Sequence, residues 1–148
     1  MFMNEKESLR SIFELRSIIE KVYFKSFEHS LDLPIKLNHT HFKTMMILNF
    51  EGEKSMSIIS DKVSLEKGSF TTVANTLIEL GFVQKLRDVE DKRVFNLKLT
   101  KKGKEFAAEF SKNHLAYMEQ RLESLTEDER SCYFASIQII NNMTRKML

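Results

Sequence analysis

Neutral polar side chains follow one face of the segment 69–79, opposite an apolar face. This polar face carries hydroxyl and amide groups, on Ser69, Thr71, Thr72, Asn75 and Thr76. Such groups both donate and accept hydrogen bonds, and a threonine methyl group can contact thymine, so the face suits base edges in the major groove of DNA. Asparagine can also pair with adenine through two hydrogen bonds. The alternative interpretation is a plain solvated surface, which most polar helix faces are.

Positive charge is concentrated in the middle of the chain, although the net charge of the whole sequence is only +2. Residues 54–104 contain 11 basic and 6 acidic side chains, whereas both flanks are slightly acidic. We predict that Lys67 contacts phosphate, and that Lys92 and Arg93 enter a narrow minor groove, where the potential is most negative. Arg87 is a further candidate for DNA contact. Many basic surfaces bind nothing, so charge alone leaves both interpretations open.

The spacing of apolar residues predicts the elements that carry these side chains. In the segment 69–79 they recur at helical spacing, and Gly81 follows where a helix end favours glycine. A shorter helix is predicted just before it, from Ser57 to Val63. Alternation with period two predicts strands over 82–87 and 93–99, joined by a charged loop. Two short helices followed by a basic hairpin describe a winged helix-turn-helix.

Longer amphipathic helices are predicted on both sides of this unit. The first spans about Lys6 to Phe27, and Asp32-Leu33-Pro34 breaks it because the residue before a proline avoids the helical conformation. Side chains suited to helix caps open three further helices, at Asn38, Thr100 and Thr126. The expected order is four helices, a two-stranded hairpin and two more helices. The fold class is therefore mainly α (α+β), in a single domain over residues 1–148.

Composition excludes several other classes of protein. The 148 residues are enough to bury one core, and with only 4 glycines and 1 proline a many-turned sandwich or barrel is disfavoured. The single cysteine, Cys132, cannot form an internal disulfide, and we expect it to be buried and inert. There is no signal-peptide pattern at the N-terminus and no apolar run of about 18 residues, so we expect a cytoplasmic protein without a membrane partner.

Motifs for catalysis are also missing from the sequence. It has no glycine-rich phosphate loop, no nucleophile elbow and no histidine–carboxylate cluster at catalytic spacing. We therefore predict that the protein is not an enzyme and uses no cofactor. A winged-helix module that binds protein or RNA remains the alternative from a different class. Such a module would be indifferent to duplex DNA at moderate salt.

Residues from about Leu37 to Glu105 resemble the winged-helix core of the MarR family of bacterial transcription regulators. The resemblance rests on the hairpin and the helix start after it, Asp88-Val89-Glu90-Asp91-Lys92-Arg93-Val94-Phe95-Asn96-Leu97-Lys98-Leu99-Thr100-Lys101-Lys102-Gly103, and on Leu77-Ile78-Glu79-Leu80-Gly81-Phe82-Val83. The sequence departs from the family in four places. Thr72 and Thr76 stand where basic residues are frequent, Val89 replaces a frequent proline, and Glu90 places a negative charge at the hairpin tip.

The resemblance implies a homodimer formed by the N- and C-terminal helices, within residues 1–30 and 105–148. Large apolar residues in both segments independently indicate a subunit interface. The resemblance also implies binding to a pseudo-palindromic operator, usually with repression, and release by a small molecule. The implied pocket lies where the dimerisation helices meet the winged domain.

For this pocket we predict aromatic and methionine walls with one polar group, formed by Phe13, Tyr23, His41, Met45 and Phe110. Such walls suit a small aromatic acid or another amphipathic effector. The alternative is that these side chains form plain dimer core.

The histidines raise the alternative of a metal-responsive regulator of the same family. His39 and His41 flank the start of the second helix, and His114 falls near a position that supplies a ligand in zinc-sensing relatives. However, Phe110 lies one turn before His114 and cannot bind metal, and the sequence has no His-x-x-x-His pair. We therefore predict no metal site.

Overall fold

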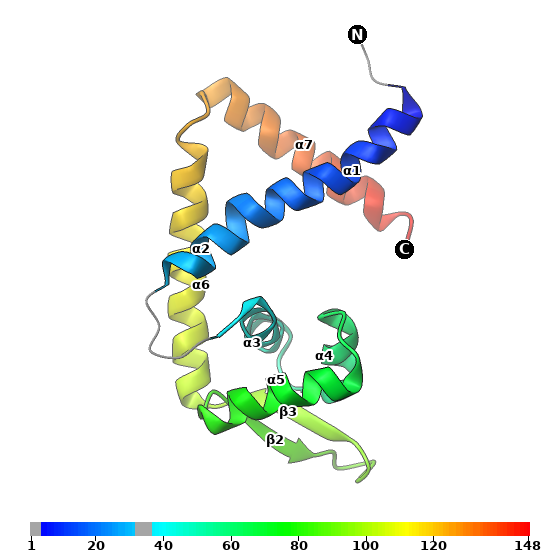
Figure 1. Cartoon of the computed structure of the whole chain (residues 1–148), viewed down its shortest axis with the longest axis vertical. Helices are drawn as coiled ribbons and strands as arrows, with labels where there is room; N and C mark the ends of the chain where they lie inside the picture. The colour runs from blue at the N-terminus through cyan, green and yellow to red at the C-terminus, as the bar shows by residue number, and fades with distance from the viewer. Residues whose placement is uncertain (1–3, 32–36) are drawn as a thin grey trace.

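Helices make up most of the molecule, and a small antiparallel sheet lies at one end (Figure 1). The computed structural model describes residues 4–31 and 37–148, so the predicted break at Asp32-Leu33-Pro34 lies outside the described residues. In chain order the elements are α1 (Glu5–Ile19), the π-helix η1 (Glu20–Lys25), α2 (Ser26–Ser30), α3 (His39–Glu51), β1 (Lys54–Ser55), α4 (Met56–Lys62), α5 (Lys67–Glu79), β2 (Val83–Arg87), β3 (Phe95–Leu99), α6 (Lys101–Leu122) and α7 (Glu127–Arg145). We call residues 5–30 the arm and residues 39–99 the core.

The predicted helix caps are confirmed. Asn38 and Thr126 each form a capping box, and the hydroxyl of Thr100 accepts a hydrogen bond from the Gly103 amide. At the start of α3 the partner of Asn38 is His41, whose Nδ1 accepts the Asn38 N–H at 3.1 Å. Each cap satisfies amide groups that have no partner within the helix, which fixes where the helix begins.

The arm differs from the single regular helix that the sequence predicts. Its middle turn is the π-helix η1, in which the chain is wider and each bond spans one residue more than in an α-helix. Ser26 supports this turn, because both its N–H and its hydroxyl donate to the Lys21 carbonyl. One extra residue in a turn barely disturbs the apolar spacing, so the pattern could not reveal it.

The sheet has three strands, in the order β1-β3-β2, rather than the two that the sequence predicts. Strands β2 and β3 form the expected hairpin, with Val83 opposite Leu99 and Arg87 opposite Phe95. The short strand β1 pairs with β3 beside Leu97 and Asn96. Two residues are too few to show a period of two, so the sequence pattern did not predict β1.

The hydrophobic core lies between α3, α4, α5 and the sheet. Its fully buried members include Met45, Ile59, Phe70, Leu77 and Leu97. A second, smaller cluster of Phe27, Phe42 and Phe110 joins the arm to the core through α6. The rings of Phe42 and Phe110 are stacked, with their centroids 4.7 Å apart. Helix α6 is therefore shared by both parts of the molecule, as Figure 1 shows.

Helices α1 and α7 have no buried residues, in contrast to the core. Large apolar side chains remain exposed along both, among them Leu9, Ile12, Phe13, Phe134, Ile137 and Ile140. Within residues 4–31 and 37–148, none of the helices is long and apolar enough to cross a membrane.

Candidate nucleic-acid interface

Helices α4 and α5 form the helix-turn-helix. The hydroxyl of Ser55 accepts from the Ile58 amide and begins α4. The turn then passes through Ser64, which has a positive φ of 58°, and the Ser60 hydroxyl donates to the Leu65 carbonyl at 2.8 Å. Ser60 is buried, so this bond fixes the turn from inside and sets the direction in which α5 leaves it.

Helix α5 buries its apolar face and exposes its polar face, as the sequence predicts. Phe70, Val73, Ala74 and Leu77 are buried. Ser69, Thr71, Thr72 and Asn75 are exposed, whereas Thr76 is half-buried. The polar face of α5 is therefore free to meet a partner outside the core.

The hydroxyl groups on this face are not equivalent. Thr71 donates to the Lys67 carbonyl at 2.9 Å, and Thr76 donates to the Thr72 carbonyl at 3.1 Å. Because each hydroxyl has a single hydrogen, these two threonines can only accept from a base edge or contact it through a methyl group. Asn75 keeps both donor and acceptor available, which makes it the group best suited to reading a base pair.

Two aspartates build the tip of the wing, which is the hairpin formed by β2, β3 and residues 88–94. The Asp88 carboxylate accepts hydrogen bonds from the amides of Glu90 and Asp91, each at 3.0 Å. A further bond from the Asn96 side chain, also 3.0 Å, holds it to β3. The amide of Asp91 is the main reason that the pKa of Asp88 is lowered, since these bonds favour the charged form.

Asp91 in turn orients Arg93. Its carboxylate accepts from Arg93 Nε at 3.1 Å, from the guanidinium Nη2 at 3.3 Å and from the Arg93 amide at 3.0 Å. The hydrogen bonding of the Arg93 side chain is the main reason that the pKa of Asp91 is lowered. The Arg93 side chain is nevertheless 91% exposed. It is therefore oriented by Asp91 and still accessible to a partner from solvent. Neighbouring Lys92 is also exposed.

The loop end of the wing and the start of α5 share a cleft of about 360 Å³. Lys67 and Thr71 of α5 line it from one side, and Arg93 lines it from the wing. Three of the residues predicted to contact DNA are thus brought together from distant parts of the sequence. Ser57 also lines the cleft, a residue that the sequence showed only as the predicted start of α4.

Arg87 lies apart from this cleft, on β2. Its guanidinium carbon is 5.4 Å from the centre of the Phe95 ring, and Lys85 Nζ is 4.2 Å from the same ring. Cations attracted to a ring face lose some conformational freedom but keep their charge. The wing therefore carries a second, preorganised pair of positive charges.

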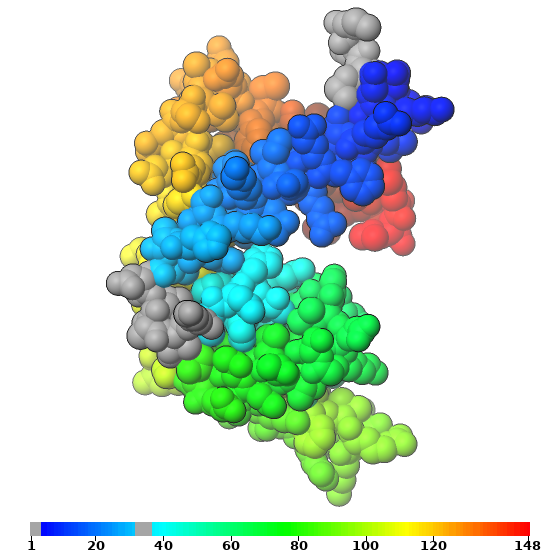
Figure 2. Space-filling view, viewed as in Figure 1, coloured from blue at the N-terminus to red at the C-terminus, as the bar shows by residue number. Residues whose placement is uncertain are grey.

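A larger cavity of about 620 Å³ lies between the arm and α3, where Figure 2 shows the molecule hollowed. Its apolar walls come from Ile19, Phe24, Phe42, Met46, Val63 and Phe110. Its polar groups include Arg16, Glu20, Glu28, His39, Lys43 and His114.

Of the five residues predicted to line a pocket, Phe110 lines this cavity and the other four do not. Met45 is buried in the core, and buried His41 caps α3. Phe13 is 78% exposed, and the Tyr23 hydroxyl bonds to that of Tyr133 at 2.9 Å. His41 and Met45 point into the core from α3, and on the π-helix Phe24 lines the cavity in place of its neighbour Tyr23.

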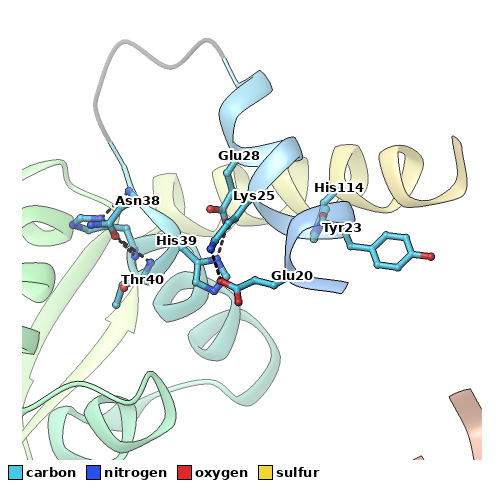
Figure 3. A network of polar contacts seen from close by, with 9 residues as sticks. Glu20, Tyr23, Lys25, Glu28, Asn38, His39, Thr40 and His114 are labelled. Carbon is cyan, nitrogen blue, oxygen red and sulfur yellow. Dashed lines mark hydrogen bonds and ion pairs between the residues drawn. The ribbon is translucent and has the colours of Figure 1, made fainter. Parts of the chain in front are cut away.

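The histidines make contacts within the protein (Figure 3). His39 Nδ1 lies 2.7 Å from Glu28 Oε1, and His114 Nε2 lies 2.6 Å from the Tyr23 carbonyl oxygen. Burial lowers the pKa of His41 and favours its neutral form, which suits its role as an acceptor. In the part of the chain that the structure describes, no three His, Cys, Asp or Glu side chains are grouped to hold a metal ion.

Cys132 differs from its prediction as well. The thiol is exposed rather than buried, because no residue of α7 is buried in the single chain. The apolar spacing of α7 was correctly assigned to a helix. It does not show whether that helix packs on its own chain.

Residues 37–95, which contain α3 to the start of β3, match the sequence model of the MarR family. Over this stretch the chain is similar to the MarR family. The chain is also 21% identical over 126 residues to YpoP of Bacillus subtilis, named as an HTH-type transcriptional regulator, a match that covers 84% of this chain and 89% of YpoP.

Solved structures agree in fold over nearly the whole chain. A MarR family protein from Bacillus stearothermophilus has a TM-score of 0.77 at 21% identity, covering 97% of this chain and 99% of that one. Streptococcus pneumoniae FabT, solved in complex with DNA, has a TM-score of 0.72 at 20% identity, covering 95% of this chain and 99% of FabT. The chain therefore shares the winged helix-turn-helix fold of both.

Proposed function

We propose that this protein is a transcriptional regulator of the MarR family, which binds a pseudo-palindromic operator as a homodimer and acts as a repressor. The observation that carries the proposal is the cleft where Lys67 and Thr71 of α5 meet Arg93 of the wing. It joins a helix with an exposed hydroxyl and amide face to a directed cation, which is the pairing that a winged helix uses on DNA. A structural relative, FabT, was solved with DNA bound.

In this proposal the side chains divide into two groups. Thr72, Asn75 and Ser69 read base edges in the major groove, while Thr71 and Thr76 contribute methyl contacts or accept hydrogen bonds. Lys67, Arg87, Lys92 and Arg93 neutralise phosphate or enter the minor groove. The winged-helix core spans about residues 37–105, and the remaining helices form the dimer.

The homodimer is supported by the exposed apolar side chains of α1 and α7. A monomer would leave these side chains in water, and exposed apolar surface of this kind marks association sites. In a symmetric dimer the same side chains of both subunits would be buried in the interface. The two copies of α5, the recognition helices, would then face successive major grooves, with half-site centres about 10–10.5 base pairs apart.

We further propose that a small amphipathic anion acts as effector in the cavity between the arm and α3. Glu20 pairs with Lys25, and Glu28 lies against His39, so both acids already have partners. Within the described part of the chain, neither Arg16 nor Lys43 has an ion-pair partner, and both line the cavity. Free cations beside aromatic walls suit a carboxylate with an apolar body.

DNA binding is tested with purified protein and the duplex that precedes its own coding region. We expect binding to an inverted repeat there, with a strong salt dependence, and little binding to a scrambled duplex of equal length. Equal affinity for both duplexes at moderate salt would contradict the proposal and favour a protein-interaction module. Because DNA is the partner, we expect the protein to act in the cytoplasm.

The effector is tested by titrating aromatic carboxylates and fatty acids against the preformed operator complex. An inducer must bind the arrangement that cannot hold DNA more tightly than the one that can. We expect at least one compound to release DNA and to raise the melting temperature of the free protein. Stabilisation without release would show a pocket that is not a switch.

A further inference from the structure

The π-helix η1 lies at the joint between the arm and the rest of the molecule. It follows α1 directly, and its residues pack against α6. Helix α6 begins beside the core, where Ala107 is buried in the hydrophobic cluster. Further along, it passes the arm near His114. Any change in how η1 is held on α6 therefore changes the angle between arm and core.

Two kinds of contact hold this joint. Apolar stacking is one: the rings of Phe27 and His114 are nearly parallel, with centroids 4.7 Å apart, and Phe24 meets His114 edge-on at 5.2 Å. The other is the bond of 2.6 Å between His114 Nε2 and the Tyr23 carbonyl oxygen. Apolar contact is non-directional and tolerates sliding, whereas a hydrogen bond to a carbonyl fixes both distance and direction.

The partner of His114 is a main-chain group of the π-helix itself. A switch from π- to α-helical bonding takes one carbonyl out of the regular ladder, so a donor from outside the helix stabilises this turn. A carbonyl only accepts, and His114 must therefore carry its proton on Nε2. The bond thus ties the widened turn to α6 at a single point.

We propose that His114 is a positioning residue that sets the half-site spacing of the operator. This inference rests on the proposed function, because spacing has meaning only for two cores joined by their arms. In such a dimer the arms are held by the partner, and each core is displaced when the joint turns. The distance between the two recognition helices is then fixed by the bond from His114 to the Tyr23 carbonyl.

The test compares two variants of His114, one that keeps an aromatic ring and one that keeps a hydrogen-bond donor. His114→Phe keeps an aromatic ring to stack on Phe27 but removes the donor. His114→Gln removes the ring but carries an amide N–H at a similar reach, and serves as the matched control. Each is titrated with palindromic duplexes whose half-site centres differ by single base pairs around about 10–10.5.

We expect wild type and H114Q to prefer one spacing, and H114F to lose roughly two- to tenfold of that preference, the size of one net hydrogen bond. Non-specific affinity should not change, since no DNA-facing cation is altered. An H114F protein that folds and keeps the wild-type spacing preference would overturn the proposal. Loss of all binding by every form, wild type included, would instead count against the proposed function.

Two measurements examine the joint without DNA. Nitroxide labels at Glu5→Cys and Glu79→Cys, in a Cys132→Ser background diluted with unlabelled protein, report the arm-to-core distance. A broader distance distribution in H114F than in wild type or H114Q is expected, and equal widths would overturn the proposal. If H114F does not fold, nitrogen NMR of wild type decides: neutral His114 must be protonated at Nε2, and the Nδ1 form would exclude the bond.

Discussion

At the scale of single residues, the wing presents two cations that are held differently. Arg93 donates three hydrogen bonds to Asp91, whereas Lys92 is exposed and has no partner among the described residues. We predict that Lys92→Ala and Arg93→Ala each reduce the slope of log affinity against log salt by about 0.9 for every phosphate that is no longer neutralised. Lys112→Ala, an exposed lysine of α6, is the control and should leave the slope unchanged. A double variant with the wild-type slope would show that the wing does not touch DNA.

Asn75 is predicted to govern which sequence is bound rather than how tightly DNA is bound. Its amide is exposed on α5, whereas the Thr71 hydroxyl is already donated to its own helix. Asn75→Ala should lose about 1–3 kcal/mol of discrimination at one base pair while non-specific affinity is kept. Competition between duplexes that differ at single base pairs measures this. Gln120→Ala, an exposed change on α6, is the control, and equal profiles for all three proteins would assign the face to solvent.

The carboxylates of the wing predict its response to acid. The pKa values of Asp88 and Asp91 are both lowered in the folded protein by the hydrogen bonds that they accept. Their contribution to stability is therefore complete above the ordinary carboxyl pKa of about 4 and is lost as the pH falls through the lower folded values. We expect the amide NMR signals of Glu90 and Arg93 to stay constant from neutral pH down to about 5. Movement of these signals between pH 5 and 7 would contradict the hydrogen bonds described.

At the scale of elements, local patterns identified what local chemistry determines. The caps at Asn38 and Thr126 and the buried face of α5 follow from residues a few positions apart, and they were predicted correctly. The π-helix and β1 were missed. The π-turn is stabilised by His114, which lies 91 residues from Tyr23, and β1 exists only because β3 lies beside it. Interactions of this kind leave no periodic signal in a single sequence.

The start of α6 gives a test of packing between elements. A Cβ added to Gly103 would lie 1.9 Å from the Phe82 carbonyl oxygen, which is main chain and cannot move aside cheaply. Gly103→Ala should therefore lower the free energy of unfolding by at least about 1–3 kcal/mol. Gly68→Ala is the matched control within α5, where nothing lies within 4 Å, and a gain of about 0.5–1 kcal/mol is expected. Denaturant titration compares them, and equal stabilities would contradict the described packing.

At the scale of the whole molecule, the residues that line the cavity could not be predicted from the sequence. Helical spacing identified apolar faces, but which face meets the cavity depends on the angle and the rotation of the arm. Phe110 of α6 lines the cavity, whereas Tyr23 lies within the π-turn and bonds to Tyr133 instead. Likewise, Cys132 could be assigned to a helix but not to a buried or exposed face.

The ends of the chain carry the prediction about assembly. Ile140 of α7 is 54% exposed in the single chain, and burying such a side chain typically stabilises by about 1.5–3 kcal/mol, once in each protomer. Ile140→Asp should therefore shift sedimentation at micromolar concentration from dimer towards monomer. Val89→Asp is the control, because Val89 is 92% exposed at the wing tip and the substitution makes a similar chemical change away from α1 and α7. A stable, folded wild-type monomer would contradict the dimer.

Selection of bound sequences from a random pool of duplex DNA by the purified full chain decides whether two α5 helices read DNA together. Two α5 helices related by a dimer axis must select the same bases twice, in inverted orientation. We expect an enriched pseudo-palindrome with half-site centres about 10–10.5 base pairs apart. A pool without enrichment, or a single asymmetric site bound by one chain, would contradict the account of a dimeric winged-helix regulator.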